Sequence, residues 1–168
     1  DVARANGLQH IAASTGNTSE QFIARHYHLP EMALIEMGDF AGAVLKYLKR
    51  HPVQKLSICG GFGKLSKLAQ GHLDLHSRAS TIDFNWLAGQ AQRQGGKDAL
   101  CRAVTNANTS LEAQQYALDQ GIDLVQPVCQ AALTQVQKIL PDTVQAEIWA
   151  VNRQGECLGM ARSEPRSL

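Results

Sequence analysis

Residues 56–71 read LSICGGFGKLSKLAQG, an apolar run that breaks into glycines and continues as a helical pattern. The run at residues 56–59 predicts a buried strand, and the helical pattern begins at Lys64. Glycines at such a turn let the backbone come close to a ligand, because no Cβ atom intervenes. The helix that follows offers unpaired N–H groups and a partial positive charge. We therefore expect an anionic ligand group at Gly60, Gly61 and Gly63.

The same alternation of strand and helix runs through the first part of the chain. We expect strands at residues 8–13, 32–37 and 55–59, and helices at residues 18–28, 40–50 and 64–70. The second part is more helical, with helices expected at residues 82–94, 97–104, 109–120 and 123–140, the last interrupted near Pro127. Residues 146–152 and 156–161 flank Gln154 and Gly155 and predict a two-stranded hairpin.

Strands that alternate with helices predict an α/β fold. We expect three layers, with a mostly parallel sheet, helices on both of its faces and a C-terminal β-hairpin. A length of 168 residues favours a single α/β domain over residues 1–168, with a body at 1–142 and the hairpin at 143–162. Ligands bind such sheets at the carboxyl ends of the strands. The loops STGNTSE (14–20), MGDF (37–40) and GGFGK (60–64) are expected to converge there.

Three side chains are expected to begin helices. Asn17 followed by Glu20 resembles a capping box, as does Thr109 followed by Glu112. Asp39 is expected either to cap the helix at residues 40–50 or to bind a hydroxyl or amine of a ligand.

Composition excludes several classes of function. A net charge of +1 gives no basic surface for nucleic acid or an anionic membrane, and no apolar run approaches the roughly 20 residues that span a bilayer. Four widely spaced cysteines without a C-x-x-C motif favour reduced thiols and a cytoplasmic protein. His72 and His76 are four residues apart but lack an obvious third ligand, so we predict no protein-bound metal.

Each motif also has a purely structural interpretation. The segment GGFGK can be a tight turn, and it matches neither a Walker loop nor a dinucleotide fingerprint. STGNTSE can simply begin a helix. Lys64 and Lys67 can be solvated rather than facing an anionic substrate.

Taken together and in order, these motifs resemble one family. STGNTSE, EMGDFAGAVL, LSICGGFGKLSKLAQGHLDLHSR and NANTSLEA are similar to segments of the CbiD family, the cobalt-precorrin-5B C-1 methyltransferases of anaerobic cobalamin biosynthesis. The most specific segments are GDFAG (38–42), GFGKLSKLAQG (61–71) and HSR (76–78). The resemblance extends from about Leu8 through the final hairpin.

The resemblance implies methyl transfer from S-adenosylmethionine to C-1 of a cobalt-precorrin. It also implies that the chain is the C-terminal portion of a longer two-domain protein, whose N-terminal half is its partner. Lys64, Lys67 and Arg78 would receive carboxylates of the substrate. Catalytic residues stay unassigned. The candidates for binding cofactor or substrate are Thr15, Gly16, Asn17, Thr18, Asp39, Gly60, Gly61, Gly63, Lys64, Lys67, His76, Ser77, Arg78, Asn108 and Thr109.

A second hypothesis is a non-catalytic α/β module that holds an anionic small molecule at the glycine turns. Binding of S-adenosylmethionine or its homocysteine product would favour the enzyme. Binding of simple anions alone, lost in Lys64→Ala, would favour the module. A purely structural domain would show no ligand effect when Gly61 or Gly63 is replaced.

Overall fold

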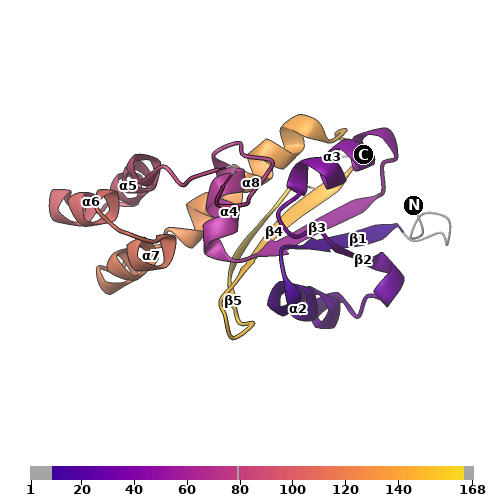
Figure 1. Cartoon of the computed structure of the whole chain (residues 1–168), viewed down its shortest axis with the longest axis horizontal. Helices are drawn as coiled ribbons and strands as arrows, with labels where there is room; N and C mark the ends of the chain where they lie inside the picture. The colour runs from indigo at the N-terminus through magenta and orange to yellow at the C-terminus, as the bar shows by residue number, and fades with distance from the viewer. Residues whose placement is uncertain (1–8, 79, 165–168) are drawn as a thin grey trace.

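A five-stranded sheet in the order β2-β1-β3-β4-β5 forms the centre of the molecule. The computed structural model describes residues 9–78 and 80–164 (Figure 1). Strands β1 to β4 pair in parallel, and β5 returns antiparallel beside β4 as the predicted hairpin. The strands are β1 (His10–Ser14), β2 (Leu34–Glu36), β3 (Lys55–Gly60), β4 (Gln145–Val151) and β5 (Cys157–Arg162).

Helices cover both faces of this sheet, so the predicted α/β architecture is confirmed. On one face α2 packs against β1, β3 and β4, and on the other α8 packs against β4, β5, α3 and α4. In Figure 1 the helices α5, α6 and α7 form a lobe beside the sheet, and we call them the helical lobe. The helices are α2 (Asn17–Tyr27), α3 (Ala41–Arg50), α4 (Phe62–Ala69), α5 (Phe84–Arg93), α6 (Asp98–Thr105), α7 (Ser110–Asp119) and α8 (Val125–Ile139).

The central strand β3 is buried on both faces, as its apolar sequence requires. Leu56 and Ile58 belong to the main core, which lies between the sheet and α3, α4 and α8. Cys59 belongs to a smaller cluster with Ile23 of α2 and Trp149 of β4. The strand therefore packs against the helical layers on both faces of the sheet, and the glycine turn begins at its carboxyl end.

A buried carboxylate connects the sheet to α2. Glu147 is 2% exposed, and its Oε1 accepts hydrogen bonds from the Tyr27 hydroxyl, Ser57 Oγ (2.7 Å) and Trp149 Nε1 (2.8 Å). Lys55 Nζ lies 3.5 Å from Oε2. Burial raises the pKa of Glu147, but the hydrogen bonds outweigh it and hold that pKa below its ordinary value. We call this group the Glu147 network.

Some predicted boundaries were wrong. The Asn17–Glu20 capping box does not form, because Gly16, in an extended conformation, is the N-cap residue of α2. The Ser19 hydroxyl accepts a hydrogen bond from the Gly16 N–H and donates one to the Gly16 carbonyl. The run at 32–37 is a strand only at Leu34–Glu36, because Pro30 leads into the short 3-10 helix η1 (Glu31–Ala33). Leu8, the expected start of the first strand, lies outside the described residues.

Helix α8 is not interrupted at Pro127, contrary to expectation. Pro127 is the third residue of the helix, where a backbone N–H has no intrahelical acceptor, so the missing donor costs no hydrogen bond.

Candidate functional site

The predicted loops meet at one edge of the sheet. Because β1, β2, β3 and β4 are parallel, the loops after β1, β2 and β3 and the turn after β4 all lie at the same edge. A cavity of about 890 Å³ opens here, and we call it the edge cavity. Its walls come from the loop of residues 15–19, the start of α4, one face of α7 and the β4–β5 hairpin.

The starts of α2 and α4 form the polar side of the edge cavity. The first N–H groups of each helix have no intrahelical acceptor and carry partial positive charge, which favours anionic groups. At Gly16 and at Gly61 an added Cβ atom would meet nothing within 4 Å. At Gly60 it would lie 2.8 Å from the Thr15 side chain, so this glycine is required for close packing. Asn17 and Thr18 are exposed and also line the cavity.

Asp39 connects the predicted loop MGDF (37–40) to the site. Its Oδ1 lies 2.6 Å from Lys64 Nζ, and the hydrogen bond from Lys64 lowers the pKa of Asp39. The expectation that Asp39 caps α3 was wrong, since Phe40 is the N-cap residue and no side chain caps this helix. Lys64 lines the edge cavity, but this ion pair offsets much of its positive charge.

The segment after α4 lies near Asp39 but does not line the edge cavity. Lys67 Nζ donates to the Leu75 carbonyl (2.9 Å), and the Leu75 N–H donates to the Asp39 carbonyl (2.8 Å). His76 Nδ1 accepts from the Arg78 N–H (3.1 Å). His76, Ser77 and Arg78 are exposed. This group of predicted residues therefore lies beside Asp39 but outside the edge cavity.

Thr109 is the N-cap residue of α7, as predicted, but the Glu112 carboxylate, the other half of the predicted capping box, accepts from the Tyr116 hydroxyl instead. Thr109 Oγ1 accepts from the Glu112 N–H (3.1 Å), and Asn108 precedes it on the surface. The next residue, Ser110, reaches the edge cavity and packs so closely on α4 that a Cβ atom at Gly63 would lie 2.9 Å from its Oγ. This predicted segment therefore sets the position of α7 against the glycine turn.

The predictions from sequence missed one wall of the edge cavity, the face of α7 formed by Leu111, Gln114, Gln115 and Leu118. Leu111 and Leu118 are 55% and 50% exposed, whereas Gln114 is 5% exposed. These positions follow the i, i+3, i+4, i+7 spacing of one helical face, which was the available signal. They were missed because a mixed apolar and amide face does not by itself point to a ligand. The hairpin residues Asn152, Arg153, Gln154 and Leu158 also line the cavity and were missed.

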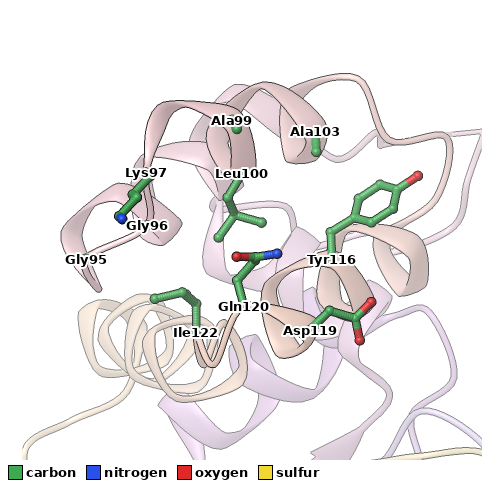
Figure 2. Close-up of a pocket in the computed structure, with 10 residues that line it drawn as sticks. All are labelled: Gly95, Gly96, Lys97, Ala99, Leu100, Ala103, Tyr116, Asp119, Gln120 and Ile122. Carbon is green, nitrogen blue, oxygen red and sulfur yellow. The ribbon is translucent and has the colours of Figure 1, made fainter.

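A second cavity, of about 510 Å³, lies within the helical lobe. Figure 2 shows Leu100, Gln120 and Ile122 pointing toward its centre, with Tyr116 and Asp119 at one side. The Tyr116 hydroxyl donates to Glu112 and Asp119 accepts from Gln115, so these two polar groups are already paired. The edge cavity is the stronger candidate, because it contains the predicted glycine turns.

Two other kinds of site receive no support from the described residues. Within 9–78 and 80–164, no three His, Cys, Asp or Glu side chains are grouped so that they could hold a metal ion. No helix in the same ranges is long and apolar enough to cross a membrane.

Comparison with known proteins identifies the family. The family model described as "CbiD, C-terminal domain" matches residues 74–162, more than half of the chain. The chain belongs to the CbiD family. The CbiD match covers α5 to α8 and the β4–β5 hairpin, which together supply the α7 and hairpin walls of the edge cavity.

Curated relatives extend this likeness over nearly the whole chain. It is 60% identical over 162 residues to the cobalt-precorrin-5B C(1)-methyltransferase of Burkholderia ambifaria and 59% identical to that of Burkholderia lata. In both cases the match covers 96% of this chain and 45% of the relative. The CbiD chain described here thus spans less than half the length of the curated relatives it matches. No solved structure matches it.

Proposed function

We propose that this chain takes part in methyl transfer from S-adenosylmethionine to C-1 of a cobalt-precorrin, a step of anaerobic cobalamin biosynthesis. The proposal rests on membership of the CbiD family together with one structural observation. That observation is the edge cavity, which brings STGNTSE and GGFGK together at the carboxyl edge of the sheet. Its volume falls in the range of about 300–1,000 Å³ that is common for small-molecule sites.

The residues of the edge cavity suit the carboxylates that both reactants carry. S-adenosylmethionine supplies a methyl group already activated on a sulfonium, so transfer requires alignment more than acid–base catalysis. The N–H groups at the starts of α2 and α4 suit a carboxylate, and Arg153 at the hairpin tip adds a positive charge. In this proposal these groups orient the reactants, and Asp39 fixes Lys64 beside them.

We further propose that the remaining length of the relatives supplies the groups that this chain lacks. The match covers 45% of each relative, so a partner segment N-terminal to this region would complete the substrate site. The protein would then act in the cytoplasm, because its four widely spaced cysteines without a C-x-x-C motif are typical of a reducing compartment.

Calorimetric titration with S-adenosylhomocysteine tests the donor site. Gly61→Ala should weaken binding by about tenfold, because its methyl group would enter space that the fold leaves open at the glycine turn. Gly89→Ala is the matched control, since Gly89 also has nothing within 4 Å but lies in α5 away from the edge cavity. Both variants should keep the melting temperature of the parent.

The titration should be made on this chain and on a protein of the relatives' full length that contains it. Equal affinity in the parent and in Gly61→Ala would place the donor elsewhere. Absence of binding in both proteins would overturn the proposed function. Binding of phosphate or sulfate alone, lost in Lys64→Ala, would instead favour the non-catalytic anion-binding module.

A further inference from the structure

Large apolar side chains are exposed around the edge cavity. Leu111 and Leu118 of α7 line this cavity and expose about half of their surface. Phe40, which is 65% exposed, directly follows Asp39, whose carboxylate pairs with Lys64 of the same cavity. We call Phe40, Leu111 and Leu118 the edge hydrophobics. Single exposed apolar residues are ordinary, but a group of them beside one cavity indicates an interaction surface.

Helix α7 is packed mainly through small side chains. Ala113, Gln114 and Ala117 are its buried residues, and the helix contacts α4, α5 and α6. Its two leucines lie at the margin of this buried side and are only half covered. A helix of a globular protein normally turns its large apolar residues toward the core. In Figure 1 the helical lobe projects from the sheet, so a further surface can reach this margin of α7.

The edge cavity is open on its outer side, because the leucines that line it are half exposed. Sites for small molecules usually enclose about 70–90% of the ligand surface. The walls that this chain provides, from the starts of α2 and α4, from α7 and from the hairpin, leave that outer side uncovered. A complete site therefore needs a cover that the described residues do not form.

The curated relatives indicate what this cover is. The match spans 45% of each relative, so more than half of their length lies outside this chain. The charge of α7 also favours one kind of partner, since residues 110–119 include Glu112 and Asp119 but no lysine or arginine. A surface with apolar side chains flanked by basic ones would complement it. A second copy of this chain, docked symmetrically, would bring the same acidic helix against itself.

We propose that the edge hydrophobics are the docking surface for the part of the full-length protein that lies outside this chain. That part presents apolar side chains flanked by basic ones, and it closes the outer side of the edge cavity. The proposal rests on the proposed function, because it takes the full-length protein to use this cavity as its site.

Hydrogen exchange followed by mass spectrometry tests the docking surface without any turnover. The comparison is between this chain and a protein of the relatives' full length that contains it. The amides of α7 should exchange more slowly in the full-length protein by about tenfold or more. The amides around Met32 are the control and should exchange equally in both, because Met32 is 44% exposed but precedes β2 at its amino end. Equal added protection at both places would overturn the proposal.

Leu118→Gln and Met32→Gln form a matched pair, since each replaces an exposed apolar side chain with an amide of similar size. In this chain alone, each should change the melting temperature by less than about 1 °C. In the full-length protein, Leu118→Gln should remove most of the added protection of α7 and lower the melting temperature by about 2 °C or more. Met32→Gln should do neither. An effect of Leu118→Gln that is the same in both proteins would overturn the proposal.

This proposal and the proposed function fail in different ways. Equal exchange of α7 in the two proteins would overturn the docking surface and leave the proposed function standing. Protection of α7 in a full-length protein that binds no S-adenosylhomocysteine and transfers no methyl group would support the docking surface and overturn the proposed function. Sedimentation of this chain alone tests for a second copy, and a dimer that Leu118→Gln dissociates would overturn the docking proposal.

Discussion

At the scale of single residues, Glu147 shows how a charge can be buried without weakening the fold. Three hydrogen-bond donors from α2, β3 and β4 converge on one of its oxygens, and Lys55 lies beside the other. Such a carboxylate is retained in its charged form because its partners replace the water it has lost. The network fixes α2 against the sheet and so fixes one wall of the edge cavity.

We expect Glu147→Gln to destabilise the protein at pH 7 by about 1–3 kcal/mol, since it replaces a charged acceptor within the network. The native pKa of Glu147 lies below its ordinary value of 4.5, so its stabilising contribution is complete above about pH 4.5 and disappears as pH falls through the native pKa. Urea unfolding of both proteins at pH 7 and pH 3 measures this. A stability difference that is the same at both pH values would show that the charge of Glu147 does not matter.

At the scale of helices and strands, the sequence predicted the type of each element well and its ends less well. The alternation of strand and helix was clear from the apolar runs, and Thr109 was correctly predicted to begin α7 as its N-cap residue. The start of α2 was misjudged because Ser19, rather than Asn17 or Glu20, bonds to the backbone of Gly16. Which of several adjacent polar side chains caps a helix depends on the path of the preceding strand. Local sequence does not specify that path.

The cap of α7 gives a second test. Thr109→Ala should lower stability by about 1 kcal/mol, because the Glu112 N–H loses its acceptor at the start of the helix. It should also weaken binding of S-adenosylhomocysteine, since α7 forms one wall of the edge cavity. Thr109→Ser keeps the hydroxyl and should restore both properties. Thermal unfolding and calorimetry provide the two measurements, and a serine variant as weak as the alanine variant would contradict this role for the cap.

At the scale of the whole molecule, the fold class and the convergence of the loops followed from sequence, but the complete cavity did not. Parallel strands bring the loops after β1, β2 and β3 to one edge, which topology alone predicts. The α7 wall depends on how the helical lobe packs beside α4, and it rests on tertiary contacts such as Gly63 against Ser110. His76, Ser77 and Arg78 belong to a specific motif, yet the fold places them outside the cavity.

The length of the relatives gives a prediction at the same scale. We expect this chain alone to bind S-adenosylhomocysteine but to transfer no methyl group to a cobalt-precorrin. A protein of the relatives' full length that contains it should do both. Mass-spectrometric detection of the methylated product measures the transfer. Turnover by this chain alone would show that it already contains every group the reaction needs.

The order of the strands also has a consequence for folding. The walls of the edge cavity come from segments near residues 15, 61, 114 and 153, which are distant in sequence. Chains that rely on such distant pairings, with parallel strands joined by crossovers, fold slowly, because long loops must close before the contacts that reward them can form. The cavity can therefore exist only in chains that have completed their topology. A ligand of this cavity would bind only the native state and not partly folded intermediates. It would therefore shift the folding equilibrium toward the native state.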